Sequence, residues 1–221
     1  MQNEQALREA LVAAGRRLIS ENLTSGTSGN ISVCDREGGY MLITPSGVDY
    51  AVCTPADMVA LRLEDGLPLC EGQLRPSIEA ELHRGVYLLR PDVQAVLHTH
   101  PVNSTVFSVI GEEIPLITDA AVQELRAPVR TAVYYPPGTA ELAAAAQAAL
   151  GEKARACLLK AHGAVCVGKS LPQAFDVAKV LENTAEIYWR IRALGLQPQP
   201  IADEHIRYMH EVLSNNYGQK K

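Results

Sequence analysis

Three histidines in this chain have the residue type and spacing of a metal site. His98 and His100 end the apolar run 93–97 and lie two residues apart. Because the side chains of a strand alternate between its two faces, both imidazoles point to one side and can bind one ion. An isolated pair of this kind is more often two ordinary strand histidines, so a third ligand is needed. His162, beside Gly163 at a bend between two strand-like runs, offers that ligand. Three histidines and one open position are the usual composition of a catalytic zinc site.

A carboxylate group is the second candidate for chemistry. Glu79 follows Ser77 and Ile78 in what we expect to be the first turn of a helix, capped by Ser77. The helix dipole favours a negative charge at that position. An ordinary N-terminal acid, paired with His83 one turn further on, remains the alternative.

Small polar residues in two loops and at one helix start could form an anion site. Gly29 and Asn30 close the segment 25–30, and Ser46-Gly47 interrupts a later strand-like run. Backbone N–H groups of such loops, and hydroxyls at helix N-termini such as that of Ser77, bind phosphate. Each loop alone is a weak signal because turns rich in glycine and serine are common.

Hydrophobic spacing predicts the elements that must position these residues. Helices are expected at residues 3–22, 77–90, 101–110, 139–150, 170–194 and 203–213. Strands are expected at residues 31–34, 40–44, 61–63, 93–100, 130–135, 156–160 and 164–167. Short strands joined by tight turns, between helices at both ends, predict an α/β domain with a mostly antiparallel sheet. No linker divides the chain, so we expect one domain over residues 1–221.

Composition excludes several classes of protein. The chain has 221 residues, of which 47% are hydrophobic and 20% charged, which favours a folded core over disorder. A net charge of -5 argues against a nucleic-acid binder. No apolar run approaches the roughly 20 residues of a membrane span, and no apolar segment resembles a signal peptide. The five cysteines form no CxxC pair, so we expect a cytoplasmic protein without a disulfide framework. No Walker loop or GxGxxG motif supports nucleotide binding.

Five motifs, in chain order, resemble the class II aldolase/adducin family, which includes L-fuculose-1-phosphate aldolases and L-ribulose-5-phosphate 4-epimerases. They are Gly26-Thr27-Ser28-Gly29-Asn30-Ile31-Ser32, Ile43-Thr44-Pro45-Ser46-Gly47, Pro76-Ser77-Ile78-Glu79, His98-Thr99-His100-Pro101 and Ala161-His162-Gly163. The resemblance implies a three-layer α/β fold with a central, mostly antiparallel sheet and helices on both faces. It also implies a homotetramer with active sites at the subunit interfaces.

The same resemblance implies roles for individual residues. The zinc ligands would be His98, His100, His162 and Glu79. The substrate phosphate would be bound by Gly29, Asn30, Ser46, Gly47 and Ser77. Glu79 would also be the catalytic acid/base, and Tyr217 a second catalytic residue that reaches the site of a neighbouring subunit.

The implied activity is that of a zinc-dependent aldolase. Such an enzyme cleaves a phosphorylated ketose, for example L-fuculose 1-phosphate, to dihydroxyacetone phosphate and an aldehyde. The alternatives are an L-ribulose-5-phosphate 4-epimerase-type enzyme, a decarboxylating relative, or a non-catalytic adducin-like protein. The epimerases typically have aspartate at the place of Glu79, which favours the aldolase.

Three positions depart from the aldolase pattern. Ile78 replaces a second phosphate-binding serine, and Asp119 stands where the fuculose-phosphate enzyme has an acid/base tyrosine. The segment 123–128 replaces a glycine-rich stretch. We therefore expect a different pocket on the aldehyde side of the substrate.

Overall fold

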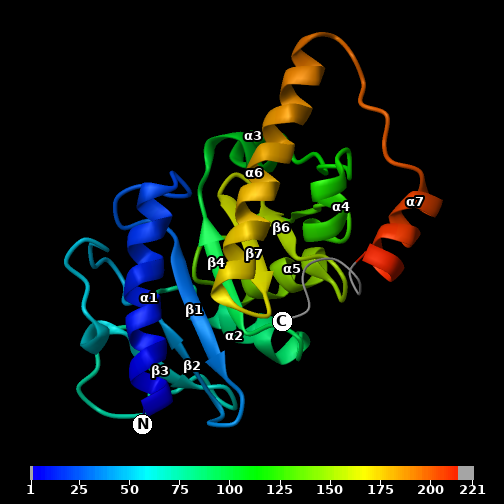
Figure 1. Ribbon diagram of the computed structural model, residues 1–221. Helices are drawn as coiled ribbons and strands as arrows, with labels where there is room; N and C mark the ends of the chain where they lie inside the picture. The colour runs from blue at the N-terminus through cyan, green and yellow to red at the C-terminus, as the bar shows by residue number, and fades with distance from the viewer. Residues whose placement is uncertain (1, 214–221) are drawn as a thin grey trace.

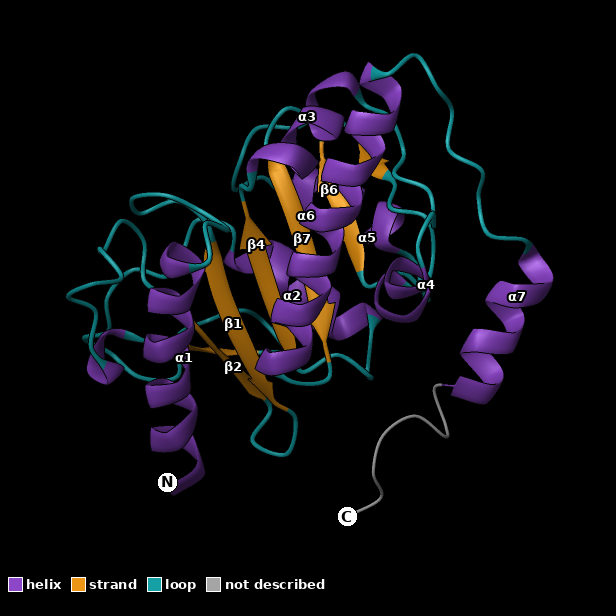
Figure 2. Ribbon diagram, turned by 45° about the horizontal axis from the view of Figure 1, so that its top comes forward, coloured by secondary structure: helices purple, strands orange, loops and turns teal. Residues whose placement is uncertain are grey.

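A twisted seven-stranded sheet forms the centre of the computed structural model, which describes residues 2–213 (Figures 1 and 2). Its strands are β1 (Asn30–Asp35), β2 (Tyr40–Ile43), β3 (Val59–Arg62), β4 (Ala95–Thr99), β5 (Thr131–Ala132), β6 (Ala156–Leu159) and β7 (Gly163–Gly168). They lie in the order β3-β2-β1-β4-β7-β6-β5. Every neighbouring pair is antiparallel except β5 and β6, which are parallel. The expected mostly antiparallel sheet is confirmed.

Helices cover both faces of this sheet, as expected. They are α1 (Gln2–Ser20), α2 (Ala80–Leu89), α3 (Val102–Ile110), α4 (Asp119–Leu125), α5 (Ala140–Leu150), α6 (Leu171–Ala193) and α7 (Asp203–Tyr208), with the short 3-10 helix η1 (Pro55–Asp57) and the short π-helix η2 (Met209–Leu213). One apolar core joins α1, α3, α4 and α6 to the sheet, and a second joins α2 and α5 to its other face. In Figure 1, α6 crosses the sheet over β4 and β7. The result is three layers.

Alternation along β4 decides which layer faces the histidines. Ala95 and Leu97 pack into the core beneath α6, whereas Val96 packs against the α2 and α5 layer. His98, two residues after Val96, faces the same side as Val96. The first histidine of the pair therefore lies beneath α2, the helix that follows Glu79.

One predicted strand was too long and one helix was missed, each for a physical reason. The strand expected at 130–135 is only Thr131–Ala132, because its partner β6 ends at Leu159 and the chain then leaves the sheet edge. Helix α4, which begins after the cap Thr118, was not predicted, because its seven residues are too few to establish a helical repeat.

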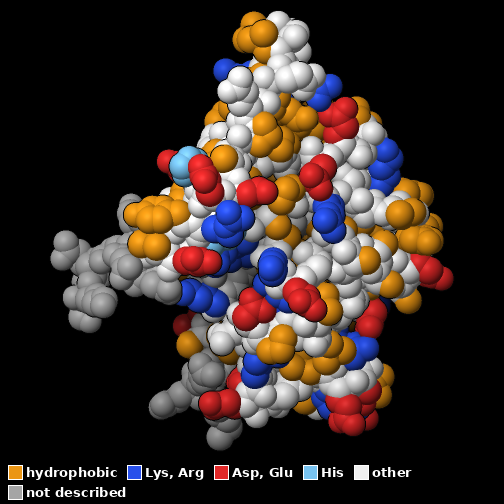
Figure 3. Space-filling view, turned by 90° about the vertical axis from the view of Figure 1, so that its right-hand side faces the viewer, with side chains coloured by type: hydrophobic (Ala, Val, Ile, Leu, Met, Phe, Trp, Pro, Cys, Tyr) orange, Lys and Arg blue, Asp and Glu red, His pale blue; other side chains and the backbone are white. Residues whose placement is uncertain are grey.

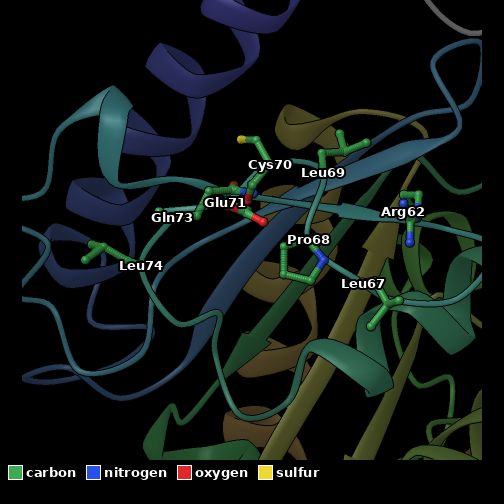
Figure 4. A pocket seen from close by; sticks show the side chains of 9 residues that line it. Arg62, Leu67, Pro68, Leu69, Cys70, Glu71, Gln73 and Leu74 are labelled. Atoms are coloured by element: carbon green, nitrogen blue, oxygen red, sulfur yellow. The ribbon is translucent and has the colours of Figure 1, made fainter.

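A loop covers the outer edge of the sheet at β3. The N–H of Arg62 donates to the carbonyl of Leu67, and the N–H of Leu69 donates to that of Ala60. The side chain of Gln73 accepts from the N–H of Ala60 at 2.7 Å. Figure 4 shows the cavity of about 400 Å³ that this loop lines, which contains none of the candidate site residues. The loop blocks further strand pairing at this edge.

Two features of the structure, the distribution of charge on its surface and the length and polarity of its helices, relate to the sequence arguments about nucleic acids and membranes. On the face seen in Figure 3, basic and acidic side chains are interspersed, so this face carries no uniform positive field. Within residues 2–213, no helix combines the length and the apolar character needed to cross a membrane.

Candidate active site

The structure brings His98, His100 and His162 together at one end of the sheet. His98 is in β4, His100 follows the end of that strand, and His162 is in the turn between β6 and β7. The Nε2 atom of His98 lies 2.8 Å from that of His100 and 3.3 Å from that of His162. One ligand atom from each histidine lies within 4.8 Å of the others, so the three could hold a metal ion.

Hydrogen bonding and burial prepare these imidazoles for a metal. Nδ1 of His98 lies 3.0 Å from the carbonyl oxygen of Ala164, which can only accept, so Nδ1 carries the hydrogen. The lone pair of His98 is therefore on Nε2, the atom that faces the other two rings. Burial lowers the pKa of His98 and of His100 to about 3, which keeps both rings in the neutral, ligating form. Three imidazole nitrogen donors suit zinc or a similar divalent ion.

The bend that presents His162 differs from the expected one. Ala161, not Gly163, has the left-handed backbone, with φ of 52°. Gly163 is required for a different reason: a Cβ atom there would overlap the ring of His100 and the carbonyl oxygen of Thr99. The glycine therefore allows the close approach of β7 to the histidine pair.

Glu79 directs its carboxylate into the histidine cluster. It occupies the N-cap position of α2 but makes no side-chain cap hydrogen bond, and it is 5% exposed. Its Oε2 lies 3.2 Å from Nε2 of His98, and its Oε1 lies 3.7 Å from Nε2 of His162. Oε2 accepts a hydrogen bond from Asn30 at 2.8 Å, whereas Oε1 is buried without a hydrogen-bond partner among residues 2–213. The alternative of a simple helix-capping acid is therefore not supported.

Ser77 is not the helix cap that its sequence context predicted. Helix α2 begins three residues later, at Ala80, and the Ser77 hydroxyl accepts a 3.3 Å hydrogen bond from the N–H of Glu79. The helix starts late because residue 77 continues an extended segment, with its N–H donating to the carbonyl of Thr44. Ser77 thus orders the turn that leads to Glu79.

A cavity of about 300 Å³ adjoins Glu79 and two of the histidines. Its lining residues are Thr27, Ser28, Gly29, Asn30, Pro45, Ser46, Gly47, Ser77, Ile78, Glu79, His100, Pro137 and His162. All five residues expected at the substrate phosphate are among them. Gly29 and Gly47 have left-handed backbones, with φ of 73° and 70°. A Cβ atom on Gly29 would also lie 2.6 Å from the carbonyl oxygen of His98, so only glycine fits there.

The side chain of Asn30 is engaged differently from the expectation. Its Nδ2 donates to Glu79, and its Oδ1 lies 2.6 Å from Nε2 of His83. Both ends of the amide are thus occupied within the protein. Sequence reasoning did not identify this link, because it depends on how α2 packs against β1.

Four further residues bear on the predicted site. Pro137 lines the cavity, whereas the sequence marked Pro136-Pro137-Gly138 only as a loop. A Cβ atom on Gly138 would lie 3.1 Å from the carbonyl oxygen of Ile78, so this loop passes close to Ile78. Ile78 itself lines the cavity with a side chain that is 64% exposed. Asp119 is in the first turn of α4 and does not line this cavity. Tyr217 lies outside the described residues.

Known proteins resemble this chain over nearly its whole length. Residues 9–189 match the family model described as Class II Aldolase and Adducin N-terminal domain. A 5-deoxy-D-ribulose 1-phosphate aldolase of Bacillus thuringiensis is 35% identical over 98% of this chain and 99% of its own. A 5-methylthioribulose-1-phosphate/5-deoxyribulose-1-phosphate aldolase of Rhodospirillum rubrum is 38% identical over 96% and 93%.

Solved structures lead to the same family. An L-fuculose 1-phosphate aldolase superposes with a TM-score of 0.89 at 33% identity, over 95% of this chain and 96% of that one. The chain therefore belongs to the class II aldolase and adducin family and is a metal-dependent aldolase of that family, a carbon–carbon lyase.

Proposed function

We propose that the protein is a zinc-dependent aldolase that cleaves a 5-deoxypentulose 1-phosphate to dihydroxyacetone phosphate and a short aldehyde. One observation carries the proposal: a single cavity joins glycine–serine loops, two histidines of the cluster and Glu79, one of whose carboxylate oxygens is buried without a hydrogen-bond partner among residues 2–213. The relatives named for 5-deoxyribulose 1-phosphate are 35% and 38% identical to the chain, and the fuculose-phosphate enzyme is 33% identical. This ordering favours the deoxypentulose over L-fuculose 1-phosphate.

In this proposal the glycine–serine loops bind the phosphate. The N–H groups of Ser46 and Ser77 already donate to backbone carbonyls. Their hydroxyl groups are therefore the donors directed to phosphate oxygens, together with the backbone at Gly29 and Gly47. Asn30 lies beside the phosphate site but uses its side chain to hold Glu79.

The zinc ligands would be His98, His100 and His162, with Glu79 as a further ligand before substrate binds. An ion bound there would supply a Lewis acid that polarises the substrate oxygens. In the cleavage, the hydroxyl on carbon 4 loses its proton, the bond between carbons 3 and 4 breaks, and the electron pair remains on the three-carbon fragment. Glu79, after gaining a proton from water in the site, would then give it to carbon 3 through Oε1. Tyr217 of a neighbouring subunit would relay the hydroxyl proton to solvent, within a cytoplasmic homotetramer.

A substrate comparison tests this function. Zinc-loaded protein is supplied with 5-deoxyribulose 1-phosphate, with L-fuculose 1-phosphate and, separately, with L-ribulose 5-phosphate. We expect release of dihydroxyacetone phosphate, measured by a coupled reductase, with the highest kcat/KM for the deoxypentulose. Interconversion of pentulose 5-phosphates without that release would identify an epimerase instead, and no reaction with any ketose phosphate would contradict the proposal.

A further inference from the structure

A row of buried polar side chains connects α2 to β1 behind Glu79. Glu79, His83 and Tyr87 follow one another at four-residue spacing and share one face of α2, while Asn30 and Ser32 share one face of β1. His83, Tyr87 and Ser32 have no solvent exposure. Asn30 lies between the two side chains Glu79 and His83, and Ser32 lies between His83 and Tyr87.

The distances make this row continuous. Nε2 of His83 lies 2.6 Å from Oδ1 of Asn30, and Nδ1 of His83 lies 2.6 Å from the Ser32 hydroxyl. The Ser32 hydroxyl in turn lies 2.7 Å from the hydroxyl of Tyr87. A hydrogen bond of 2.8 Å from Asn30 to Glu79 completes it. The row therefore ends at a carboxylate oxygen in the active site.

The chemistry of the groups fixes the direction of every hydrogen bond. An ionised carboxylate only accepts, so Asn30 turns Nδ2–H toward Glu79 and Oδ1 toward His83. Oδ1 also only accepts, so His83 donates through Nε2–H and, as a neutral ring, accepts through Nδ1. Ser32 then donates its hydrogen to His83 and accepts that of Tyr87.

Burial holds the row in this protonation state. Burial raises the pKa of Tyr87, so its hydroxyl keeps its hydrogen, and the two partners of His83, an amide oxygen at Nε2 and a hydroxyl at Nδ1, suit a neutral ring. All four hydrogen bonds then run from Tyr87 toward Glu79. Hydrogen bonds aligned in one direction polarise one another, so each strengthens the next.

We propose that this row positions the Glu79 carboxylate for proton exchange, with His83 as its central positioning residue. The inference rests on the proposed function of Glu79. By holding Oε2 through Asn30, the row leaves Oε1, beside His162, as the oxygen that exchanges the proton. His83, Ser32 and Tyr87 do not line the substrate cavity. In this proposal they act on Glu79 only through Asn30.

Removal of one hydroxyl tests the row with little change in packing. In zinc-loaded Ser32→Ala, Nδ1 of His83 loses its hydrogen-bond donor, so the ring is held only through Asn30 and the link to Tyr87 is broken. We expect kcat to fall about tenfold, the usual effect of removing such a supporting group, with metal content unchanged. KM for the ketose phosphate should stay within about twofold, because the phosphate contacts are unaltered.

Two further variants serve as controls. One tests the effect of losing any buried serine hydroxyl, and the other tests whether the effect decreases with distance from Glu79 along the row. Ser108→Ala also removes one fully buried serine hydroxyl, which has no hydrogen-bond partner among residues 2–213, and should leave kcat unchanged. Tyr87→Phe should cost less than Ser32→Ala, because Ser32 still donates to His83. Equal kcat in Ser32→Ala and the parent protein, or an equal loss in Ser108→Ala, would overturn the proposal.

A measurement independent of turnover separates this inference from the proposed function. Nitrogen-15 NMR of the imidazole side chains in the zinc-loaded protein reports which nitrogen of His83 carries hydrogen. We expect the Nε2–H tautomer in both proteins, with the Nδ1 resonance of His83 shifted in Ser32→Ala because that nitrogen has lost its hydrogen bond. An Nδ1–H tautomer or a doubly protonated ring in the parent protein would refute the row even if the aldolase is active. Absence of dihydroxyacetone phosphate release with the expected tautomer would instead refute the proposed function alone.

Discussion

At the scale of single residues, Glu79 combines two environments on one side chain. Oε2 is held by Asn30 and faces His98, whereas Oε1 is buried, unpartnered among residues 2–213 and faces His162. A buried carboxylate oxygen without a donor is costly unless a cation or a substrate proton satisfies it. The proposed chemistry supplies both, the cation before substrate binds and the proton during turnover.

Glu79→Gln separates proton transfer from metal binding. The glutamine keeps the size of the side chain but cannot carry the proton, while the three histidines still hold the ion. We expect kcat to fall by roughly 10²–10⁴, with most of the metal retained. Metal analysis and steady-state kinetics on the same preparation check this. Loss of metal in parallel with the rate, and recovery on adding zinc, would show that Glu79 is mainly a ligand.

At the scale of the elements, local patterns predicted more than long-range packing did. Strand alternation predicted that His98 and His100 lie on one side, because the two residues belong to one continuous run, β4 and the residue directly after it. The positions of Glu79 and Asn30 relative to them were not predictable, because they depend on α2 packing across β1. The overextended strand at 130–135 has the same origin: its β-favouring residues have no partner beyond Ala132.

Two substitutions, one in the turn between β6 and β7 and one at the first residue of β7, are expected to have opposite effects. Gly163→Ala places a Cβ atom against the His100 ring and a backbone oxygen, so we expect a loss of about 1–3 kcal/mol of stability and weaker metal binding. Ala161→Gly relieves a left-handed backbone in the same turn and should keep the metal. Thermal unfolding and metal titration measure both. Normal zinc affinity in Gly163→Ala would contradict the close approach described for β7.

At the scale of the whole molecule, exposed apolar side chains gather on α3. Val102 is 76% exposed, and Val106, Val109 and Ile110 are exposed on the same helix. Contiguous apolar surface on a globular protein commonly marks an interaction site. We therefore propose the α3 surface as one contact between subunits of the expected homotetramer.

The expected homotetramer predicts the mass of the protein in solution. We expect light scattering to give about four times the 23.9 kDa chain mass. Val106→Lys introduces a charge into the α3 surface and should shift the mass to smaller species, because an unpaired charge is costly at an apolar interface. Val52→Lys, at an exposed position outside α3, is the matched control. A fully active monomer would contradict the tetramer and the proposed role of Tyr217.

Buried neutral histidines also predict how stability depends on pH. The pKa values of His83, His98 and His100 are lowered to about 3, whereas in the unfolded chain they are near 6.5. Between these values the unfolded state binds more protons, so the free energy of unfolding falls as the pH falls from about 6.5 toward 3. Urea unfolding of metal-free protein at pH 7, 6 and 5 measures this fall at pH values above those at which carboxyl groups usually titrate. Constant stability across that window would contradict neutral, buried imidazoles.

The measurement that tests the central claim most directly is a zinc titration of metal-free protein, followed by the release of dihydroxyacetone phosphate from 5-deoxyribulose 1-phosphate. If the histidine cluster and Glu79 form one catalytic site, activity should be absent without metal, rise in proportion to zinc and reach its plateau at one ion per chain. His100→Ala should remove both the stoichiometric binding and the turnover. Full turnover by metal-free protein, or unchanged zinc stoichiometry in His100→Ala, would contradict the account.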